Sequence, residues 1–150
     1  MKRIVLKGRG LVSGMVEGEC LVSNKAFGFW GEYDPMRGIV TDARHDWYGK
    51  KIAEKILVFP LARGSTGGAG VFLESVRRKN YPLAIVVKEA ETILITGPML
   101  AKEFYNIDIP VVDRLNRDPT NVIKTGDWVK VDGEKGMVEI VQKSLRESRP

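Results

Sequence analysis

The chain has 150 residues, the length of one ordinary domain, and 24 Lys and Arg against 19 Asp and Glu give it a net charge of +5. It contains one Cys and one His, too few for a structural zinc site, an iron–sulfur cluster or a disulfide framework. With 43% hydrophobic residues it can bury an ordinary core. We therefore predict a single domain over residues 1–150, with a flexible tail at 143–150.

The positive charge is spread along the chain, and the one basic block is Arg77-Arg78-Lys79. Proteins that bind nucleic acid usually concentrate such charge on one face or tail, so we expect no nucleic-acid partner. No segment approaches the ~20 apolar residues of a membrane span, and the charged N-terminus is too short for a signal peptide. These features predict a cytoplasmic protein without a membrane partner, whose charge serves solubility or the binding of a small anion.

Short apolar runs broken by glycines predict β-strands at 4–6 and 15–22. Residues 27–34 hold four aromatic side chains and two glycines, which predicts a loop. A further strand is predicted at 38–41. The continuous apolar run at 56–60 is typical of a strand that is buried on both faces.

The middle of the chain alternates between strand and helix patterns. Phe72, Leu73 and Val76 share one face of a helix predicted over 69–79. An apolar run at 92–96 precedes a short helix, which we expect to begin at Gly97-Pro98 with Pro98 in its first turn. This alternation predicts a parallel sheet. The other elements expected are strands at 83–87 and 109–112, a turn at 125–127, and a hairpin of 128–131 with 137–141.

The segment Arg63-Gly64-Ser65-Thr66-Gly67-Gly68 joins the strand at 56–60 to the predicted helix. Ligands of open α/β sheets bind beyond the carboxyl ends of strands, and a helix N-terminus offers N–H donors and positive potential. Glycines let the backbone approach an anion, and Arg63 adds a cation. We therefore expect a carboxylate, a phosphate or a developing oxyanion to be bound by Arg63, Gly64, Thr66 and Gly67.

Ser65 is the side chain of this loop that can carry proton or covalent chemistry, provided that N–H donors or a cation stabilise its alkoxide. A Ser or Thr before a helix is also the usual N-cap, and that interpretation of Ser65 or Thr66 stays open. The loop is not a Walker loop, because no Lys follows its second glycine. It is not a nucleophile elbow, because Arg63 stands where the leading glycine would be.

Two further candidates lie in Asp42-Ala43-Arg44-His45-Asp46. Arg44 is a candidate for binding a substrate anion. His45 could contact substrate or act as a general base, although a lone His is more often a buried hydrogen-bonding residue. The segment Phe29-Trp30-Gly31 could cover a ligand, dock a partner or form a small satellite core.

Together these segments resemble the small subunit of aconitase X, and most closely its archaeal form, the phosphomevalonate dehydratases. The resemblance covers about residues 2–141, and it implies a swivelling β/β/α three-layer domain of the α/β class, similar to the mobile domain of aconitase. Asp46-Trp47 departs from the family, which commonly has Pro-Leu after Arg-His. The segments that carry the resemblance are Phe29-Trp30-Gly31, Asp34-Pro35, Arg44-His45, Arg63-Gly64-Ser65-Thr66 and Thr125-Gly126-Asp127 with its hairpin.

The resemblance implies a heteromeric hydro-lyase that dehydrates (R)-5-phosphomevalonate to trans-anhydromevalonate 5-phosphate in the archaeal mevalonate pathway of isoprenoid synthesis. It also implies that this chain is inactive alone and completes an active site with a large subunit. Ser65 would be the base that abstracts the proton. A [4Fe–4S] cluster on the large subunit would be the Lewis acid.

Three alternatives remain at this point. One is the small subunit of another dehydratase of the superfamily, such as one that acts on a hydroxyproline. Another is a phosphohistidine carrier with the same swivelling architecture, which would need a His at the helix start where this chain has Ser65-Thr66. The third is a binding module without chemistry.

Overall fold

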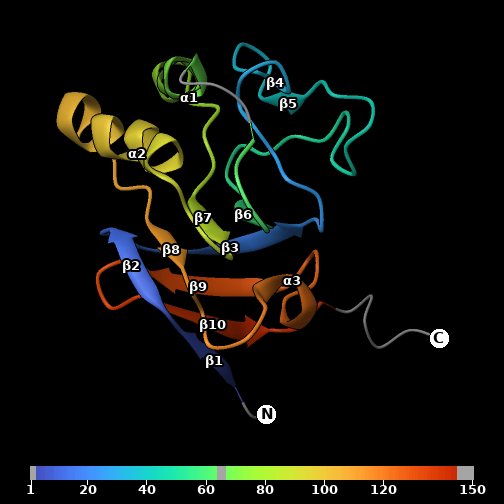
Figure 1. The fold of residues 1–150 in the computed structure, drawn as a ribbon, viewed down its shortest axis with the longest axis vertical. Helices are drawn as coiled ribbons and strands as arrows, with labels where there is room; N and C mark the ends of the chain where they lie inside the picture. Colours follow the sequence, from blue (N-terminus) through green and yellow to red (C-terminus); the bar gives the residue numbers. More distant parts are fainter. Residues whose placement is uncertain (1–2, 64–66, 145–150) are drawn as a thin grey trace.

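A computed structural model describes residues 3–63 and 67–144 (Figure 1). The elements in chain order are β1 (Ile4–Lys7), β2 (Arg9–Val12), β3 (Met15–Val22), β4 (Tyr33–Asp34), β5 (Ile39–Val40), β6 (Ile56–Phe59), α1 (Gly67–Arg77), β7 (Ala84–Val87), α2 (Thr92–Tyr105), β8 (Val111–Asp113), α3 (Pro119–Val122), β9 (Trp128–Asp132) and β10 (Met137–Gln142).

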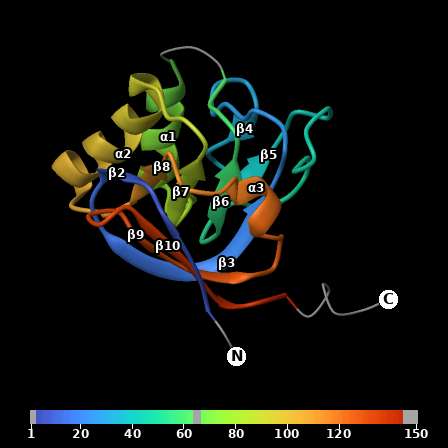
Figure 2. The ribbon, with the colours of Figure 1, turned by 60° about the horizontal axis from the view of Figure 1, so that its bottom comes forward.

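Within the described residues, eight strands form a sheet in the order β1-β10-β9-β3-β6-β7-β8-β2. Strands β1, β10, β9 and β3 pair antiparallel, whereas β3, β6, β7 and β8 pair parallel. Figures 1 and 2 show the two halves as stacked layers that share β3, with α1 and α2 on the far side of the parallel half. This arrangement confirms the predicted β/β/α three-layer fold.

The two ends of the sheet, β1 and β2, are consecutive in the chain and are joined by Gly8. A Cβ atom at Gly8 would lie 2.4 Å from the carbonyl oxygen of Asp113, so the chain can pass β8 here only without a side chain.

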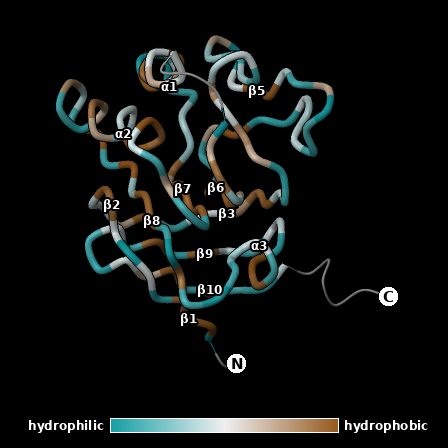
Figure 3. The backbone as a smooth tube through the Cα atoms, in the orientation of Figure 1, coloured by the Kyte–Doolittle hydropathy of each residue, from teal (hydrophilic) through white to brown (hydrophobic). Residues whose placement is uncertain are grey.

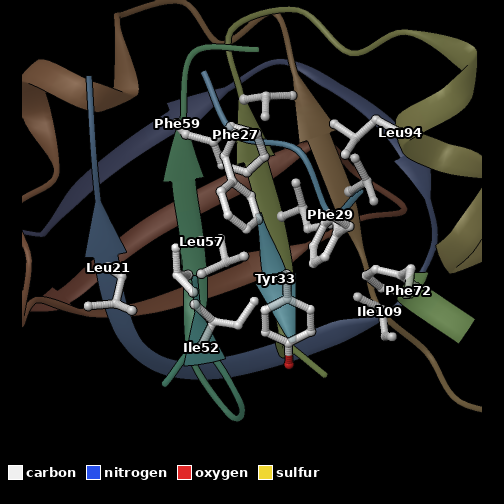
Figure 4. Close-up of a cluster of buried hydrophobic side chains, with 14 of the residues drawn as sticks. Leu21, Phe27, Phe29, Tyr33, Ile52, Leu57, Phe59, Phe72, Leu94 and Ile109 are labelled. Atoms are coloured by element: carbon white, nitrogen blue, oxygen red, sulfur yellow. The ribbon is translucent and has the colours of Figure 1, made fainter. Parts of the chain in front are cut away.

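The parallel strands are buried on both faces, as their continuous apolar runs predict. Leu57 and Phe59 of β6 face the helix side, where they join a cluster with Phe27 and Phe72 (Figure 4). Their neighbours Ile56 and Val58 belong to a second cluster between the two halves of the sheet. In Figure 3 hydrophobic colouring marks the central strands and also parts of α2.

The connection between β3 and β6, residues 23–55, is tied to the helix side of the core. Phe27 and Phe29 pack edge to face, with ring centroids 5.1 Å apart, and Phe29 packs on Phe72 of α1 at 5.0 Å. The Tyr33 hydroxyl donates a hydrogen bond to the carbonyl of Asn80, just beyond α1. In this aromatic segment, residues 27–34, Phe27, Phe29 and Tyr33 are therefore core and set the position of α1, whereas Trp30 is exposed.

The prediction for the start of the second helix was wrong. Helix α2 begins at Thr92, and Pro98 lies inside it rather than in its first turn. Its buried residues Leu94, Gly97, Pro98 and Ala101 recur at helical spacing, and Gly97 lies against the ring of Phe72. Packing of this face on α1 outweighs the hydrogen bond that Pro98 cannot donate.

Part of the tail expected at 143–150 is described. The Lys143 ammonium and the Ser144 backbone N–H both bond to the buried carboxylate of Asp127, at 3.0 and 2.7 Å. Residues 145–150 lie outside the described part of the chain. Among the described helices, none has the length and apolar character needed to cross a bilayer.

Candidate active site at the carboxyl end of β6

The predicted site lies where β6 leads into α1. Three of the predicted residues, Gly64, Ser65 and Thr66, lie outside the described residues, but Arg63 and Gly67 on either side of them are described. Helix α1 starts at Gly67 and has no acidic residue in its first turn. Its N-terminal positive potential is therefore not offset from within the helix.

The backbone of Arg63 is held by the aromatic segment. Its N–H donates a hydrogen bond of 3.0 Å to the carbonyl of Phe27. Its own carbonyl oxygen lies against Gly28, where a Cβ atom would be only 1.8 Å away. Residues 27 and 28 thus run alongside Arg63 and hold its backbone in place.

The side chain of Arg63 is held by two carboxylates. Its Nε and Nη2 donate to the Oε2 and Oε1 of Glu32 at 3.1 and 2.6 Å, and Nη2 also donates to Oδ2 of Asp42 at 3.2 Å. The hydrogen bond with Glu32 raises the pKa of Arg63, and the backbone N–H of Arg44 is the main cause of the lowered pKa of Asp42. Arg63 and Asp42 are therefore both charged at neutral pH.

Arg44 lies beside this group. Its side chain is 91% exposed, and its Nε is 3.4 Å from Oδ1 of Asp42. An open hollow of about 410 Å³ is lined by Trp30, Glu32, Asp42, Arg44 and Arg63 with their neighbours. The structure therefore brings the two predicted arginines together, with the Asp42 carboxylate between them and the Glu32 carboxylate on Arg63.

His45 does not line this hollow. The side chain is buried, with ring centroids 5.3 Å from Phe27 and 4.9 Å from Trp47. Its Nδ1 accepts a hydrogen bond from the backbone N–H of Trp47, and burial lowers its pKa. Within the described residues its Nε2 has no hydrogen-bond partner. His45 is thus an uncharged member of the aromatic core at neutral pH.

Sequence reasoning did not find Glu32 or the pairing of Asp42 with Arg63. These carboxylates are 31 and 21 residues from Arg63 in the chain. Glu32 stands in the aromatic segment, where no periodic pattern connects it to the glycine-rich loop.

The described residues do not fit an iron–sulfur cluster. In residues 3–63 and 67–144, no group of three or more His, Cys, Asp or Glu side chains could hold a metal ion. Cys20 is buried in β3, and burial raises the pKa of its thiol, which disfavours the thiolate that a cluster requires.

Comparison with known families identifies the family to which this chain belongs. The family model for the aconitase X swivel domain matches residues 5–140. The chain belongs to this family. The resemblance predicted from the sequence is thereby confirmed, and the layers described above are those of an aconitase X swivel domain.

Curated relatives match over nearly their whole length. The phosphomevalonate dehydratase small subunit of Thermococcus kodakarensis is 46% identical over 137 residues, 91% of this chain and 96% of its own. The protein of the same name from Methanococcoides burtonii is 39% identical over 143 residues, 95% of this chain and 100% of its own.

Solved structures agree with the swivel-domain assignment. A chain of the crystal structure of Thermococcus kodakaraensis aconitase X in its holo form superposes with a TM-score of 0.84 at 45% identity, covering 93% of this swivel domain and 99% of that chain. The solution NMR structure of a UPF0107 protein gives a TM-score of 0.80 at 35% identity, covering 93% and 100%.

Proposed function

We propose that this chain is the small subunit of a phosphomevalonate dehydratase, a hydro-lyase that converts (R)-5-phosphomevalonate to trans-anhydromevalonate 5-phosphate. The observation that carries the proposal is its 39–46% identity to small subunits of that name, which it matches over 96–100% of their length. A small subunit implies a large-subunit partner, with which this chain would share an active site.

In this proposal Ser65 abstracts the proton from the carbon next to the substrate carboxylate. A serine hydroxyl is a poor base unless its alkoxide is stabilised. The start of α1 at Gly67, without an acid in its first turn, supplies positive potential next to residues 64–66. The fixed backbone of Arg63 gives the loop a defined start.

The substrate carries a carboxylate and a phosphate, so its binding requires positive potential. We assign its anionic groups on this chain to Gly64, Thr66 and the first turn of α1 from Gly67, together with the exposed Arg44. His45 is left out of this set because it is buried and lies outside the hollow.

The departing hydroxyl needs a Lewis acid. We assign it to a [4Fe–4S] cluster on the large subunit. The membership of this chain in the aconitase X family supports that assignment.

The test is reconstitution. The chain and its large subunit are purified, mixed under anaerobic conditions, and assayed for loss of (R)-5-phosphomevalonate and formation of the anhydro product. We expect turnover by the mixture and none by either subunit alone.

A mixture that dehydrates a hydroxyproline but leaves phosphomevalonate unchanged would replace the proposed substrate with that of the related dehydratases. Transfer of phosphate to His45 of the isolated chain would favour a phosphohistidine carrier instead. The burial of His45 argues against that result.

A further inference from the structure

Three exposed apolar side chains border the edge of the sheet at which β6 ends. Trp30 is 56% exposed, Leu61 47% and Ile93 38%. They come from three segments, namely the aromatic segment, the residues after β6 and the first turn of α2. We call these three residues the rim patch. A single exposed apolar side chain is ordinary on a protein surface, so the position that the three share is the informative feature.

The surroundings of Arg63 bring the rim patch together. Trp30 lines the open hollow with Arg63, and Ile93 lines a second, small cavity of about 20 Å³ with Arg63 and Gly68. A Cβ atom at Gly68 would lie 3.8 Å from the backbone nitrogen of Trp30. Leu61 stands two residues before Arg63 in the chain. Trp30 and Ile93 therefore both lie close to the point at which β6 leads into α1.

Trp30 differs from the exposed Trp128 in its polar contacts. The indole N–H of Trp128 donates a hydrogen bond of 2.8 Å to Oε1 of Glu17. Within the described part of the chain, the indole N–H of Trp30 has no hydrogen-bond partner. Its neighbours in the sequence are nevertheless fixed, because Phe29 packs in the core and Glu32 pairs with an arginine. An exposed tryptophan on a rigid backbone suits the anchor of an interface, since ordering it on binding costs little entropy.

Two exposed aromatic side chains lie away from this edge. Helix α2 begins at Thr92, beyond the end of β7, so Ile93 is at the carboxyl edge of the parallel strands. Phe104, which is 67% exposed, is about 16 Å further along the helix at 1.5 Å per residue. Trp128 is on β9, in the antiparallel half of the sheet. A partner centred on the carboxyl edge of β6 therefore covers the rim patch and leaves these two side chains in solvent.

We propose that the rim patch, with Trp30 as its anchor, is the surface on which the large subunit docks. This inference rests on the proposed function, because a site shared by two subunits requires the partner to cover the edge that carries Arg63 and Gly67. The matching surface of the large subunit has an apolar recess for the indole ring, with a hydrogen-bond acceptor for its N–H, and apolar side chains against Leu61 and Ile93.

The binding test measures the Kd of the full chain for the purified large subunit by calorimetry, under anaerobic conditions and without substrate. We expect Trp30→Ala to raise Kd at least about tenfold and Ile93→Ala about threefold. The matched controls are Trp128→Ala and Phe104→Ala, which remove exposed aromatic rings elsewhere on the molecule. Their Kd should equal that of the wild type.

Two results would overturn the proposal. One is a Trp30→Ala chain that binds the large subunit with the wild-type Kd. The other is a control variant, Trp128→Ala or Phe104→Ala, that loses as much affinity as Trp30→Ala. Because Trp30 is exposed, the urea midpoint of the isolated Trp30→Ala chain should equal that of the wild type, which separates a loss of binding from a loss of folding.

A second readout leaves the sequence unchanged. Side chains of the wild-type chain are labelled with a photogenerated carbene, first alone and then in the complex. We expect the labelling of Trp30 and Ile93 to fall at least about threefold in the complex, because an interface anchor is desolvated on binding. The labelling of Phe104 and Trp128 should not change. Equal labelling of Trp30 in the free chain and in the complex would overturn the proposal.

The docking surface and the proposed function fail in different ways. A complex whose Kd depends on Trp30 but which does not dehydrate phosphomevalonate would keep the docking surface and reject the proposed substrate. A complex that dehydrates phosphomevalonate, with a Kd and a labelling pattern independent of Trp30, would keep the proposed function and reject the docking surface.

Discussion

Two arginines of this protein bind carboxylates in nearly the same geometry but in different settings. Arg9 donates from Nε and Nη2 to the two oxygens of Asp113, both at 2.8 Å, and Asp113 also accepts the backbone N–H of Ala90. Arg63 makes a comparable two-bond contact with Glu32. In both cases a partly exposed guanidinium covers a nearly buried carboxylate.

The difference lies in what else joins the partners. Arg9 and Asp113 are directly opposite each other in the ladder between β2 and β8. Their ion pair therefore closes a contact that backbone hydrogen bonds already make. Arg63 and Glu32 lie in connections rather than in strands. Their side chains are joined directly, and they do not face each other in a strand ladder. The comparison predicts that the first pair governs stability and the second governs the geometry of the site.

The largest expected effect on stability comes from Arg9→Ala. It leaves the fully buried Asp113 carboxylate without its cation, which should lower the free energy of unfolding more than either substitution discussed below. Urea denaturation measures the loss, and kcat of the reconstituted complex should stay within about twofold of the wild type. An unchanged urea midpoint would show that Asp113 does not depend on Arg9.

The same variant should change the response to acid. Burial alone would raise the pKa of Asp113, but the bonds from Arg9 and Ala90 hold it below its usual value. The wild type therefore gains stability from this group above the unfolded pKa of about 3.9, and loses it only as the pH falls through the lower folded value.

In Arg9→Ala the effect of burial prevails, and the pKa of Asp113 rises in the folded state. The stability gap between the two proteins should then narrow as the pH falls from 7, because the protonated Asp113 no longer needs a cation. Urea midpoints at a series of pH values measure the gap, and a gap independent of pH would contradict this origin of the effect.

Gly28→Ala tests the surroundings of the Arg63–Glu32 pair through the backbone of Arg63. A Cβ atom there would lie 1.8 Å from the carbonyl oxygen of Arg63, so residue 63 must move. We expect about 2 kcal/mol of destabilisation from the overpacking, together with a fall of at least about tenfold in kcat. The control is Gly70→Ala, since nothing lies within 4 Å of a Cβ atom at that position of α1. Equal kcat values for the two variants would contradict the role of the 27–63 contact.

The smallest effect on the free energy of unfolding is expected at a third bidentate ion pair. Glu89 and Arg114 are 48% and 56% exposed, so solvent and salt screen their interaction. Glu89→Gln should leave the urea midpoint close to that of the wild type. A cost near that of Arg9→Ala would mean that bidentate geometry, rather than burial, sets the strength of these pairs.

Much of the fold follows from local patterns in the sequence. The apolar runs of β6 and β7 predict strands buried on both faces, and the glycine-rich segment after β6 marks the candidate site. The start of α2 was missed because Pro98 suggests a first turn, although the helical spacing of Leu94 and Ala101 indicates an earlier beginning. Helix α3, with its Asp118 cap, was not predicted either, although Asp-Pro is a common helix start.

The environment of Arg63 could not be predicted in this way. Its partners Glu32 and Asp42 come from a long connection whose path is set by the packing of Phe27, Phe29 and neighbouring aromatic residues. A cation beside a glycine-rich loop suggests an anion site in any sequence. The folded chain shows that this cation, Arg63, is already paired with the carboxylates of Glu32 and Asp42.

The most direct test of the account is the turnover of the reconstituted complex with Ser65→Ala. As the proposed base is removed, kcat should fall by about 10³-fold, with the two subunits still co-eluting in gel filtration as in the wild type. An assembled Ser65→Ala complex that dehydrates phosphomevalonate at the wild-type rate would contradict the assignment of the proton transfer to this loop.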